Sequence, residues 1–276
     1  MARFDKGVFL MATFGFIGTG NMGGAVAKAV AKAVGGESVF LSNRTAQKAE
    51  MVAKVTGGTV CDNETAARQD YIFLGVKPQM MAGMLEGIRP VLQERAAKGE
   101  TFTLVTMAAS LTIEKIREMA GVNAPIVRIM PNLPVSIGEG VILYTSDGAE
   151  ATLPALLEAL TPAGMLVPTE ERLIDAGSAV AGCGPAFACL FAEALADGGV
   201  ECGLPRAQAM KLALQMLAGT AQLLLQENEH PAVLKDAVCS PGGTTIAGVH
   251  ALEKGGFRAA AIDAVKAAYD KTIALK

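Results

Sequence analysis

A glycine-rich turn near the N-terminus offers the clearest chemistry in this sequence. Gly18, Gly20 and Gly23 follow a G-x-G-x-x-G pattern between an apolar run, Phe14–Ile17, and an Ala/Val-rich segment predicted as a helix over about Asn21–Val34. In such a turn the first glycine permits a tight bend, the second lets a pyrophosphate approach backbone N–H groups, and the third lets the helix pack closely on the strand. We therefore predict a dinucleotide-binding turn with the anion at the helix N-terminus; a glycine turn without a ligand is the alternative.

The residues after the second predicted strand, at positions 38–41, indicate which dinucleotide binds. An acid there would accept hydrogen bonds from the ribose of NAD, and none is present. The position carries small donors and cations instead: Ser42, Asn43, Arg44 and Thr45, with Lys48 one helical turn later. Because the planar fork of Arg44 suits a dianionic 2′-phosphate, we expect NADPH, with NADH as a second cofactor that the chain could use. Alternatively, Arg44 and Lys48 are solvated first-turn residues.

Two further segments are expected at the same edge of the sheet. The near-continuous apolar run at residues 71–76 is typical of a buried parallel strand and leads into Val76-Lys77-Pro78. The run at residues 101–106 repeats the pattern and leads to Ala108 and Ala109, small residues that leave room for a ring. Since ligands bind in the crevice at the carboxyl ends of such strands, both segments are predicted to lie beside the cofactor.

The pattern of elements divides the chain into two domains. Strand and helix patterns alternate up to about Val167, which indicates an α/β fold with a doubly wound Rossmann-type domain over residues 1–167. Over residues 168–276 strand patterns stop, and Ala/Leu-rich helices are predicted at residues 170–179, 185–202, 205–226, 231–238, 245–254 and 257–273. Their apolar faces exceed what one bundle could bury, so an all-α dimerisation domain is expected. Met1–Leu10 is too short for a signal peptide and is expected to be a frayed extension.

Composition argues against several classes of function. The net charge is −3 and no basic stripe occurs, so nucleic acid is not expected as a partner. The mean hydropathy is +0.37, but no apolar run reaches the length of a membrane span, so the excess is assigned to a subunit interface. The five cysteines lack C-x-x-C spacing and only two histidines are present, which argues against a metal site. Free thiols without a secretory signal favour a cytoplasmic location.

A second glycine-containing loop lies between two of the predicted helices, at residues 236–245. Gly242 and Gly243 let the backbone approach a ligand, and Thr244 and Thr245 place backbone donors and two hydroxyls at the start of a helix. Such a helix start is a ready site for a carboxylate. A well-capped helix start with no ligand is the alternative.

This loop and several other motifs resemble those of the pyrroline-5-carboxylate reductases, the enzymes that make proline. The most specific match is Ser-Pro-Gly-Gly-Thr-Thr-Ile at residues 240–246, followed by Leu-Glu-Lys-Gly-Gly-Phe at 252–257. Further matches, at 76–78, 128–132 and 182–187, extend the resemblance over nearly the whole chain together with the glycine turn. The resemblance implies reduction of 1-pyrroline-5-carboxylate to L-proline by hydride transfer from NAD(P)H, the last step of proline biosynthesis.

The resemblance also implies roles for particular residues. The backbone amides of Gly243, Thr244 and Thr245 would hold the substrate carboxylate, and the Thr245 hydroxyl would be the catalytic contact to the ring nitrogen. The residues that fall where the family contacts NADP(H) are Ile17, Gly18, Thr19, Gly20, Asn21, Met22, Asn43, Arg44, Asn63, Val76, Lys77, Pro78, Ala108 and Ala109. Because a cyclic imine arrives partly protonated, no strong general acid is needed, and His230 and His250 are assigned to cap and surface positions. Homodimers joined through the helical domain are implied, with a decamer as a larger assembly.

Other functions are left open by the residues alone. A β-hydroxyacid dehydrogenase shares the two-domain plan but places a catalytic lysine four residues after the second glycine of a Gly-x-Gly. Here Gly182-Cys183-Gly184 is followed at that distance by Ala188, so alcohol oxidation lacks its base. An imine reductase with another substrate is a second alternative. A non-catalytic NADP-binding protein, the third, would keep the glycine turn and Arg44 but would have no need for residues 240–245.

Overall fold

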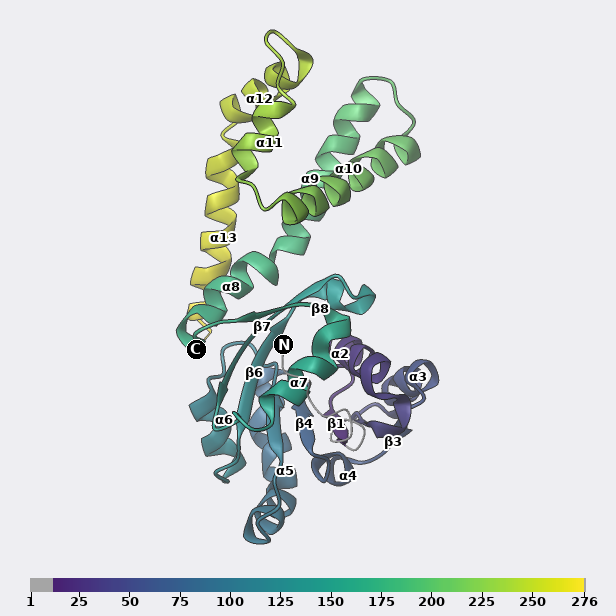
Figure 1. The fold of residues 1–276 in the computed structure, drawn as a ribbon, viewed down its shortest axis with the longest axis vertical. Helices are drawn as coiled ribbons and strands as arrows, with labels where there is room; N and C mark the ends of the chain where they lie inside the picture. The colour runs from purple at the N-terminus through teal and green to yellow at the C-terminus, as the bar shows by residue number, and fades with distance from the viewer. Residues whose placement is uncertain (1–11, 276) are drawn as a thin grey trace. The chain divides into compact units, whose positions relative to one another are not determined.

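The computed structural model describes residues 12–275, so the predicted extension Met1–Leu10 lies outside it. Strands and helices alternate in the first part of the chain, and helices alone make up the last part (Figure 1). The strands are β1 (Phe14–Ile17), β2 (Val39–Ser42), β3 (Thr59–Val60), β4 (Tyr71–Leu74), β5 (Thr103–Thr106), β6 (Ile126–Pro131), β7 (Gly140–Asp147) and β8 (Gly164–Pro168). The helices among them are α2 (Asn21–Val34), α3 (Ala46–Thr56), α4 (Asn63–Ala67), α5 (Pro78–Ala97), α6 (Ile113–Ala120) and α7 (Leu153–Leu160).

The strands form one sheet in the order β3-β2-β1-β4-β5-β6-β7-β8. All neighbouring pairs from β3 to β6 are parallel, and the strand order reverses between β1 and β4. Gly75 N donates to the carbonyl of Ile17 at 2.8 Å, so the segments that follow β1 and β4 begin side by side at this reversal. The predicted doubly wound Rossmann-type fold is confirmed, and its switch point is where such sheets bind ligands.

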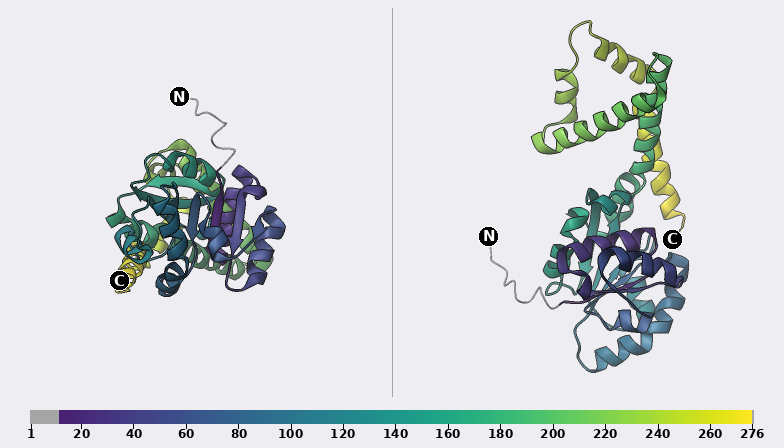
Figure 2. Two further views of the ribbon diagram at one scale, coloured as in Figure 1. Left: turned by 90° about the horizontal axis from the view of Figure 1, so that it is seen from below. Right: turned by 90° about the vertical axis from the view of Figure 1, so that its right-hand side faces the viewer.

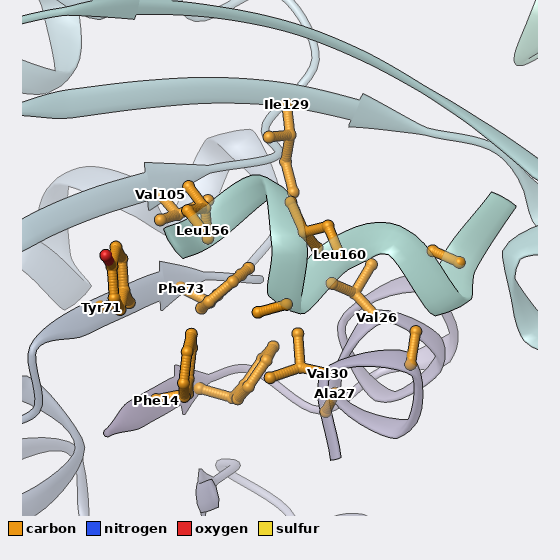
Figure 3. Packing of buried hydrophobic residues seen from close by; sticks show 14 of the residues in the cluster. Phe14, Val26, Ala27, Val30, Tyr71, Phe73, Val105, Ile129, Leu156 and Leu160 are labelled. Carbon is orange, nitrogen blue, oxygen red and sulfur yellow. The ribbon is translucent and has the colours of Figure 1, made fainter. Parts of the chain in front are cut away.

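The central strands β1, β4 and β5 are buried on both faces, which is why their sequences are largely apolar runs rather than alternations. Phe14 stacks on Tyr71 and Phe16 on Phe73, with ring centroids 5.0 and 4.2 Å apart. These rings lie on the face covered by α2, α3 and α7. Figure 3 shows Phe14 and Phe73 beside side chains of α2 and α7. Ile72 points to the opposite face and packs with the apolar side chains of α4, α5 and α6.

The end of the sheet departs from strict alternation of strand and helix. β7 follows β6 through the short 3-10 helix Leu133–Ile137 and Gly138, and it pairs with β6 antiparallel. A connection of this length cannot form a crossover helix, so the chain reverses direction. Gly138 has φ +83°, a conformation that favours glycine and permits the reversal.

The last part of the chain is all helical. A 3-10 turn, Glu171–Leu173, leads into α8 (Ile174–Ala181), α9 (Gly184–Glu201), α10 (Arg206–Glu227), α11 (Pro231–Ala237), α12 (Thr244–Lys254) and α13 (Phe257–Ile273). The predicted helix starts at Pro185, Pro205 and Pro231 are each within one residue of the observed ones, because proline is tolerated in a first turn.

By its contacts the chain divides into two compact units. The N-terminal unit extends to Gly182 and takes in the chain end from Tyr269, and the helical unit is Cys183–Ala268. This division falls after the predicted boundary between residues 167 and 168. The reason is that α8 packs on β7, and that Asp175 on α8 pairs with Arg128 on β6 at 3.1 Å.

Within the helical unit, α9 and α10 pack against each other (Figure 2). Their buried residues are small: Ala192 and Ala196 on α9, and Ala209 and Ala213 on α10. In the part of the chain that the structure describes, one helical stretch, Glu171–Glu201, has the length and hydropathy of a membrane span. It comprises the 3-10 turn, α8 and α9, with a break at residues 182–183.

Candidate functional site

A cavity of about 1370 Å³ lies at the carboxyl ends of β1, β2, β4 and β5. Its volume exceeds the roughly 300–1,000 Å³ of pockets for drug-sized ligands, as an extended ligand such as a dinucleotide requires. Each strand contributes the residues that follow it: the glycine turn after β1, Asn43 and Arg44 after β2, and Lys77 and Ala108 after β4 and β5. The parallel arrangement thus brings together four segments that are far apart in the sequence.

The glycine turn has the geometry of a phosphate-binding turn. Gly18 has φ +103°, so the bend requires a glycine. A Cβ on Gly23 would lie 2.0 Å from the carbonyl oxygen of Gly18, so close packing of helix on strand also requires one. A Cβ on Gly20 would meet no atom within 4 Å, so the protein leaves open the space beside this backbone. The observed geometry agrees with the roles predicted for Gly18 and Gly23, and the approach of a pyrophosphate at Gly20 stays a prediction.

The N-terminus of α2 has the features of an anion-binding site. Its N-cap is Gly20, no side chain caps it, and its first turn carries no acid. Hydrogen bonding within the helix begins with Gly24 N, which donates to the carbonyl of Gly20. The backbone N–H groups of the first turn therefore lack helical acceptors, and with the helix dipole they favour a phosphate.

Three cations line the cavity: Arg44, Lys48 and Lys77. None of the three takes part in an ion pair among residues 12–275, although other Lys and Arg side chains in the same unit do. Arg44 and Lys48 are exposed, and both belong to the segment after β2, where a second phosphate group would meet them. An unpaired guanidinium beside an open cavity is suited to a doubly charged phosphate.

All the residues predicted to contact the cofactor line this cavity except Thr19. Thr19 is buried, with a relative exposure of 3%, and its backbone N–H donates to Oδ1 of Asn43 at 3.0 Å. Its side-chain Oγ1 is buried and has no hydrogen-bond partner in the described part of the chain. Thr19 therefore connects the glycine turn to the loop after β2, and a direct contact between Thr19 and a cofactor stays a prediction.

Helix α5 supplies lining residues that the sequence reasoning missed: Gln79, Met80, Gly83, Met84 and Gly87. A Cβ on Gly83 or on Gly87 would meet no atom within 4 Å, because this face of α5 borders the cavity. Glycine inside a helix costs roughly 1 kcal/mol relative to alanine. Gly83 and Gly87 lie one turn apart in a segment for which no helix was predicted, so the sequence reasoning missed this ligand-facing surface.

Cys61 and Asp62 complete the rim after β3. Burial raises the pKa of the Cys61 thiol to about 11, and the neighbouring charge of Asp62 adds to the rise. Asp62 is the N-cap of α4 and accepts a hydrogen bond from Thr65 N at 2.8 Å. This bond holds the pKa of the Asp62 carboxyl below its usual value, so the Asp62 carboxylate stays negatively charged at the rim.

The loop at residues 240–245 belongs to the helical unit. Gly242 has φ +70°, and Gly243 is the N-cap of α12, whose start no side chain caps and whose first turn carries no acid. Gly243 N donates to the carbonyl of Ser240 at 3.0 Å, and helical bonding begins with Ala247 N, so the free donors at this helix start are the N–H groups of Thr244, Thr245 and Ile246. Both threonines are exposed, and within residues 12–275 their hydroxyls make no hydrogen bond.

Comparison with known proteins finds a family match in each of the two units. The family model for pyrroline-5-carboxylate reductase dimerisation matches residues 171–275, and the model described as NADP oxidoreductase, coenzyme F420-dependent, matches residues 13–102. Pyrroline-5-carboxylate reductase 3 of Danio rerio is 39% identical over 266 residues, which cover 93% of this chain and 89% of that protein. The pyrroline-5-carboxylate reductase of Synechocystis is 42% identical over 214 residues, 76% of this chain and 77% of its own length.

The chain belongs to the pyrroline-5-carboxylate reductase family. Among solved structures, the Plasmodium falciparum pyrroline carboxylate reductase with NADP bound superposes with a TM-score of 0.83 at 32% identity, covering 96% of this chain and 98% of that one. The Coxiella burnetii pyrroline-5-carboxylate reductase superposes with a TM-score of 0.86 at 27% identity, with the same coverage. The predicted family is confirmed.

The two histidines lie at a helix cap and at an exposed position of the helical unit. His230 is the N-cap of α11, where its Nδ1 accepts a hydrogen bond from Ala232 N at 3.2 Å, and His250 is exposed on α12. Among residues 12–275, no three His, Cys, Asp or Glu side chains gather as metal ligands do. The cap and surface positions predicted for the histidines agree with this placement.

Proposed function

We propose that this chain reduces 1-pyrroline-5-carboxylate to L-proline with NADPH, the last step of proline biosynthesis. The observation that carries the proposal is the uncapped start of α12 behind Gly242-Gly243, in a chain whose relatives are named pyrroline-5-carboxylate reductases over most of their length. In the reaction, hydride goes to the carbon of the C=N bond, a proton goes to the nitrogen, and NADPH becomes NADP⁺.

The chain's residues fit NADPH, which supplies the hydride when bound. The N–H groups of Gly20, Asn21 and Met22 would hold the pyrophosphate at the start of α2. Arg44 and Lys48, both without an ion-pair partner among the described residues, would hold the 2′-phosphate, and the Plasmodium relative has NADP bound. NADH would bind through the same turn but without the contacts of these two cations.

The substrate is held by the loop before α12. The free N–H groups of Thr244 and Thr245 would bind the carboxylate, where the helix dipole adds to the attraction. The N–H of Gly243 was predicted to bind the carboxylate too, but it already donates to the carbonyl of Ser240. Gly243 would instead contribute by letting the backbone come close to the carboxylate. The hydroxyl of Thr245 orients the ring nitrogen, and most of the rate then comes from positioning rather than from a strong acid.

The working assembly is proposed to be a homodimer joined through the helical unit, with a decamer built from such dimers as the larger form. A match to the family's dimerisation model and the many exposed apolar side chains of the helical unit support this. We propose a cytoplasmic location, with neither nucleic acid nor a membrane as a partner. The apolar stretch Glu171–Glu201 is assigned to the subunit interface.

The direct test is the oxidation of NADPH, followed by absorbance, in the presence of 1-pyrroline-5-carboxylate. We expect turnover with this imine and L-proline as the product. NADP⁺ reduction by β-hydroxyacids tests the dehydrogenase alternative, and cyclic imines without a carboxylate test a general imine reductase. Binding of NADPH with no turnover of any of these substrates would contradict the proposed reaction.

Thr245→Ala should lower kcat by roughly ten- to a hundredfold, the scale of about 1.4–2.7 kcal/mol for one positioned hydrogen bond in the transition state. The backbone donors remain in this variant, so KM for the imine should change little. Thr244→Ala is the matched control, because it removes the neighbouring hydroxyl at the same helix start. Equal damage from both changes, or none from Thr245→Ala, would show that the role assigned to Thr245 is wrong.

A further inference from the structure

Both the oxygen and the nitrogen of the Asn43 carboxamide are engaged within the protein. Its Oδ1 accepts a hydrogen bond from Thr19 N at 3.0 Å, and its Nδ2 donates to the carbonyl of Thr45 at 3.0 Å. Both distances are those of well-formed hydrogen bonds. The side chain thus spans from the glycine turn after β1 to the loop after β2, the loop that also carries Arg44. Although Asn43 borders the cavity, its amide is oriented by these two bonds.

Asn63 offers an informative contrast at the same cavity. Its Oδ1 accepts a hydrogen bond from Ser42 Oγ at 2.6 Å, which joins the end of β2 to the start of α4. Its Nδ2 makes no hydrogen bond to any residue between 12 and 275, and Asn63 is exposed. Asn63 therefore keeps both N–H donors of its amide for a ligand, whereas one of the two N–H donors of Asn43 is already used by the Thr45 carbonyl.

Because the Asn43 side chain hydrogen-bonds both Thr19 and Thr45, replacing it with alanine would release the loop that carries Arg44 from the glycine turn. The Arg44 guanidinium is exposed and has no ion pair within the described chain, so the backbone alone limits where it can point. The hydrogen bonds to Thr19 and Thr45 fix that backbone at its first residue. A preorganised loop binds its ligand more tightly because less conformational entropy is lost on binding.

We propose that Asn43 is a positioning residue for cofactor selection and makes no contact with the 2′-phosphate. It holds the loop after β2 against the glycine turn, and Arg44 with Lys48 then discriminates NADPH from NADH. This inference rests on the proposed NADPH binding. It differs from the role that the family resemblance implied for Asn43, which was a direct cofactor contact.

The test measures the affinities of NADPH and NADH by nicotinamide fluorescence, with no imine present. In the otherwise unchanged chain, Asn43→Ala should weaken NADH roughly threefold and NADPH roughly tenfold, within the range of one or two lost hydrogen bonds. The same change is then made in a chain that also carries Arg44→Ala and Lys48→Ala. There it should weaken both cofactors by the same factor, because the groups through which Asn43 favours NADPH are gone.

Two results would overturn the inference while leaving the proposed function intact. If Asn43→Ala still weakens NADPH more than NADH in the chain without the two cations, Asn43 contacts the 2′-phosphate itself. If it weakens both cofactors equally even with Arg44 and Lys48 present, it supports the fold without selecting a cofactor. An original chain that binds neither cofactor would overturn the proposed function together with this inference. Thermal unfolding of each variant checks that the N-terminal unit stays folded.

Discussion

The two units of this protein bury their apolar residues to very different extents. In the N-terminal unit the largest side chains are inside: Phe14, Phe16 and Phe73 are at most 1% exposed. In the helical unit the buried apolar residues among those described are alanines, while Leu190 and Leu225 are each 68% exposed. The N-terminal unit therefore buries its large apolar side chains by itself, whereas the helical unit leaves large apolar side chains exposed to solvent.

This difference supports the proposed homodimer joined through the helical unit. Helices that are apolar over much of their circumference must be buried, and monomers rarely leave so much apolar surface in water. Burial by another copy agrees with the family's dimerisation model, which begins at residue 171. The stability of such a unit cannot be separated from protein concentration.

The largest expected effect comes from replacing exposed leucines of the helical unit. Leu190→Asp with Leu225→Asp should abolish the assembly or unfold the helical unit, because each buried leucine contributes about 1.5–3 kcal/mol and a dimer contains each one twice. The matched control is Met51→Asp with Val55→Asp on α3, two side chains that are 67% and 70% exposed. Sedimentation at micromolar concentration should show an intact assembly for the control alone. A stable, active monomer of the unchanged protein would contradict this prediction.

The next largest effect concerns the ion pair that fixes α8 to the sheet. Arg128 is 1% exposed and lies 3.1 Å from Asp175 and 3.3 Å from Glu171. Arg128→Ala should lower the free energy of unfolding by about 3–5 kcal/mol, because it removes the cation beside a carboxylate that is 2% exposed. The control is Arg172→Ala, whose exposed pair with Glu170 should contribute nothing measurable. Equal denaturation midpoints for the two variants would contradict the contrast.

Much of this architecture was predictable because single residues constrain the local backbone. Gly18 and Gly23 are required by a positive φ and by close packing, so the turn could be located from sequence. Pro231 occupies the first position of α11, and the predicted α13, residues 257–273, agrees with the observed bounds. Such features depend on neighbours in the chain, which a sequence shows directly.

Features that depend on distant partners could not be predicted. Arg128 and Asp175 are 47 positions apart in the sequence, and the residue types alone do not indicate that these two side chains form an ion pair. The strand β7 was not predicted, because the sequence was interpreted as alternating strands and helices and only a short 3-10 helix separates β7 from β6. The role of Asn43 depends on a hydrogen bond from a backbone N–H 24 positions away. Sequence shows which donors exist and not which of them are already used.

A smaller effect is expected on cofactor affinity when a cation that lines the cavity of the N-terminal unit is removed. Arg44→Ala should weaken NADPH by about 1–3 kcal/mol, the contribution of a charge-assisted hydrogen bond, and should leave NADH almost unchanged. The affinity of each cofactor measured by fluorescence checks the prediction. Equal losses for both would mean that Arg44 does not bind the 2′-phosphate.

The smallest effect compares thiols of the two units. Cys61 borders the cavity, whereas Cys189 and Cys202 are exposed on the helical unit. Because burial and Asp62 raise the pKa of Cys61 to about 11, the protonated thiol is the form that the fold favours. Its contribution to stability is therefore present below about pH 9 and is lost as the pH rises through about 11.

Alkylation by iodoacetamide, followed by mass spectrometry of each cysteine, measures this directly. At about pH 8 Cys61 should react more slowly than Cys202, and its rate should still rise between about pH 9 and 11, because the thiolate is the reactive form. Asp62→Asn should shift that rise to lower pH by removing the adjacent negative charge. NADPH should slow the reaction of Cys61, which borders the cavity, and leave Cys202 unaffected. Fast labelling of Cys61 near neutral pH, insensitive to NADPH, would mean that this side of the cavity is more open than the structure indicates.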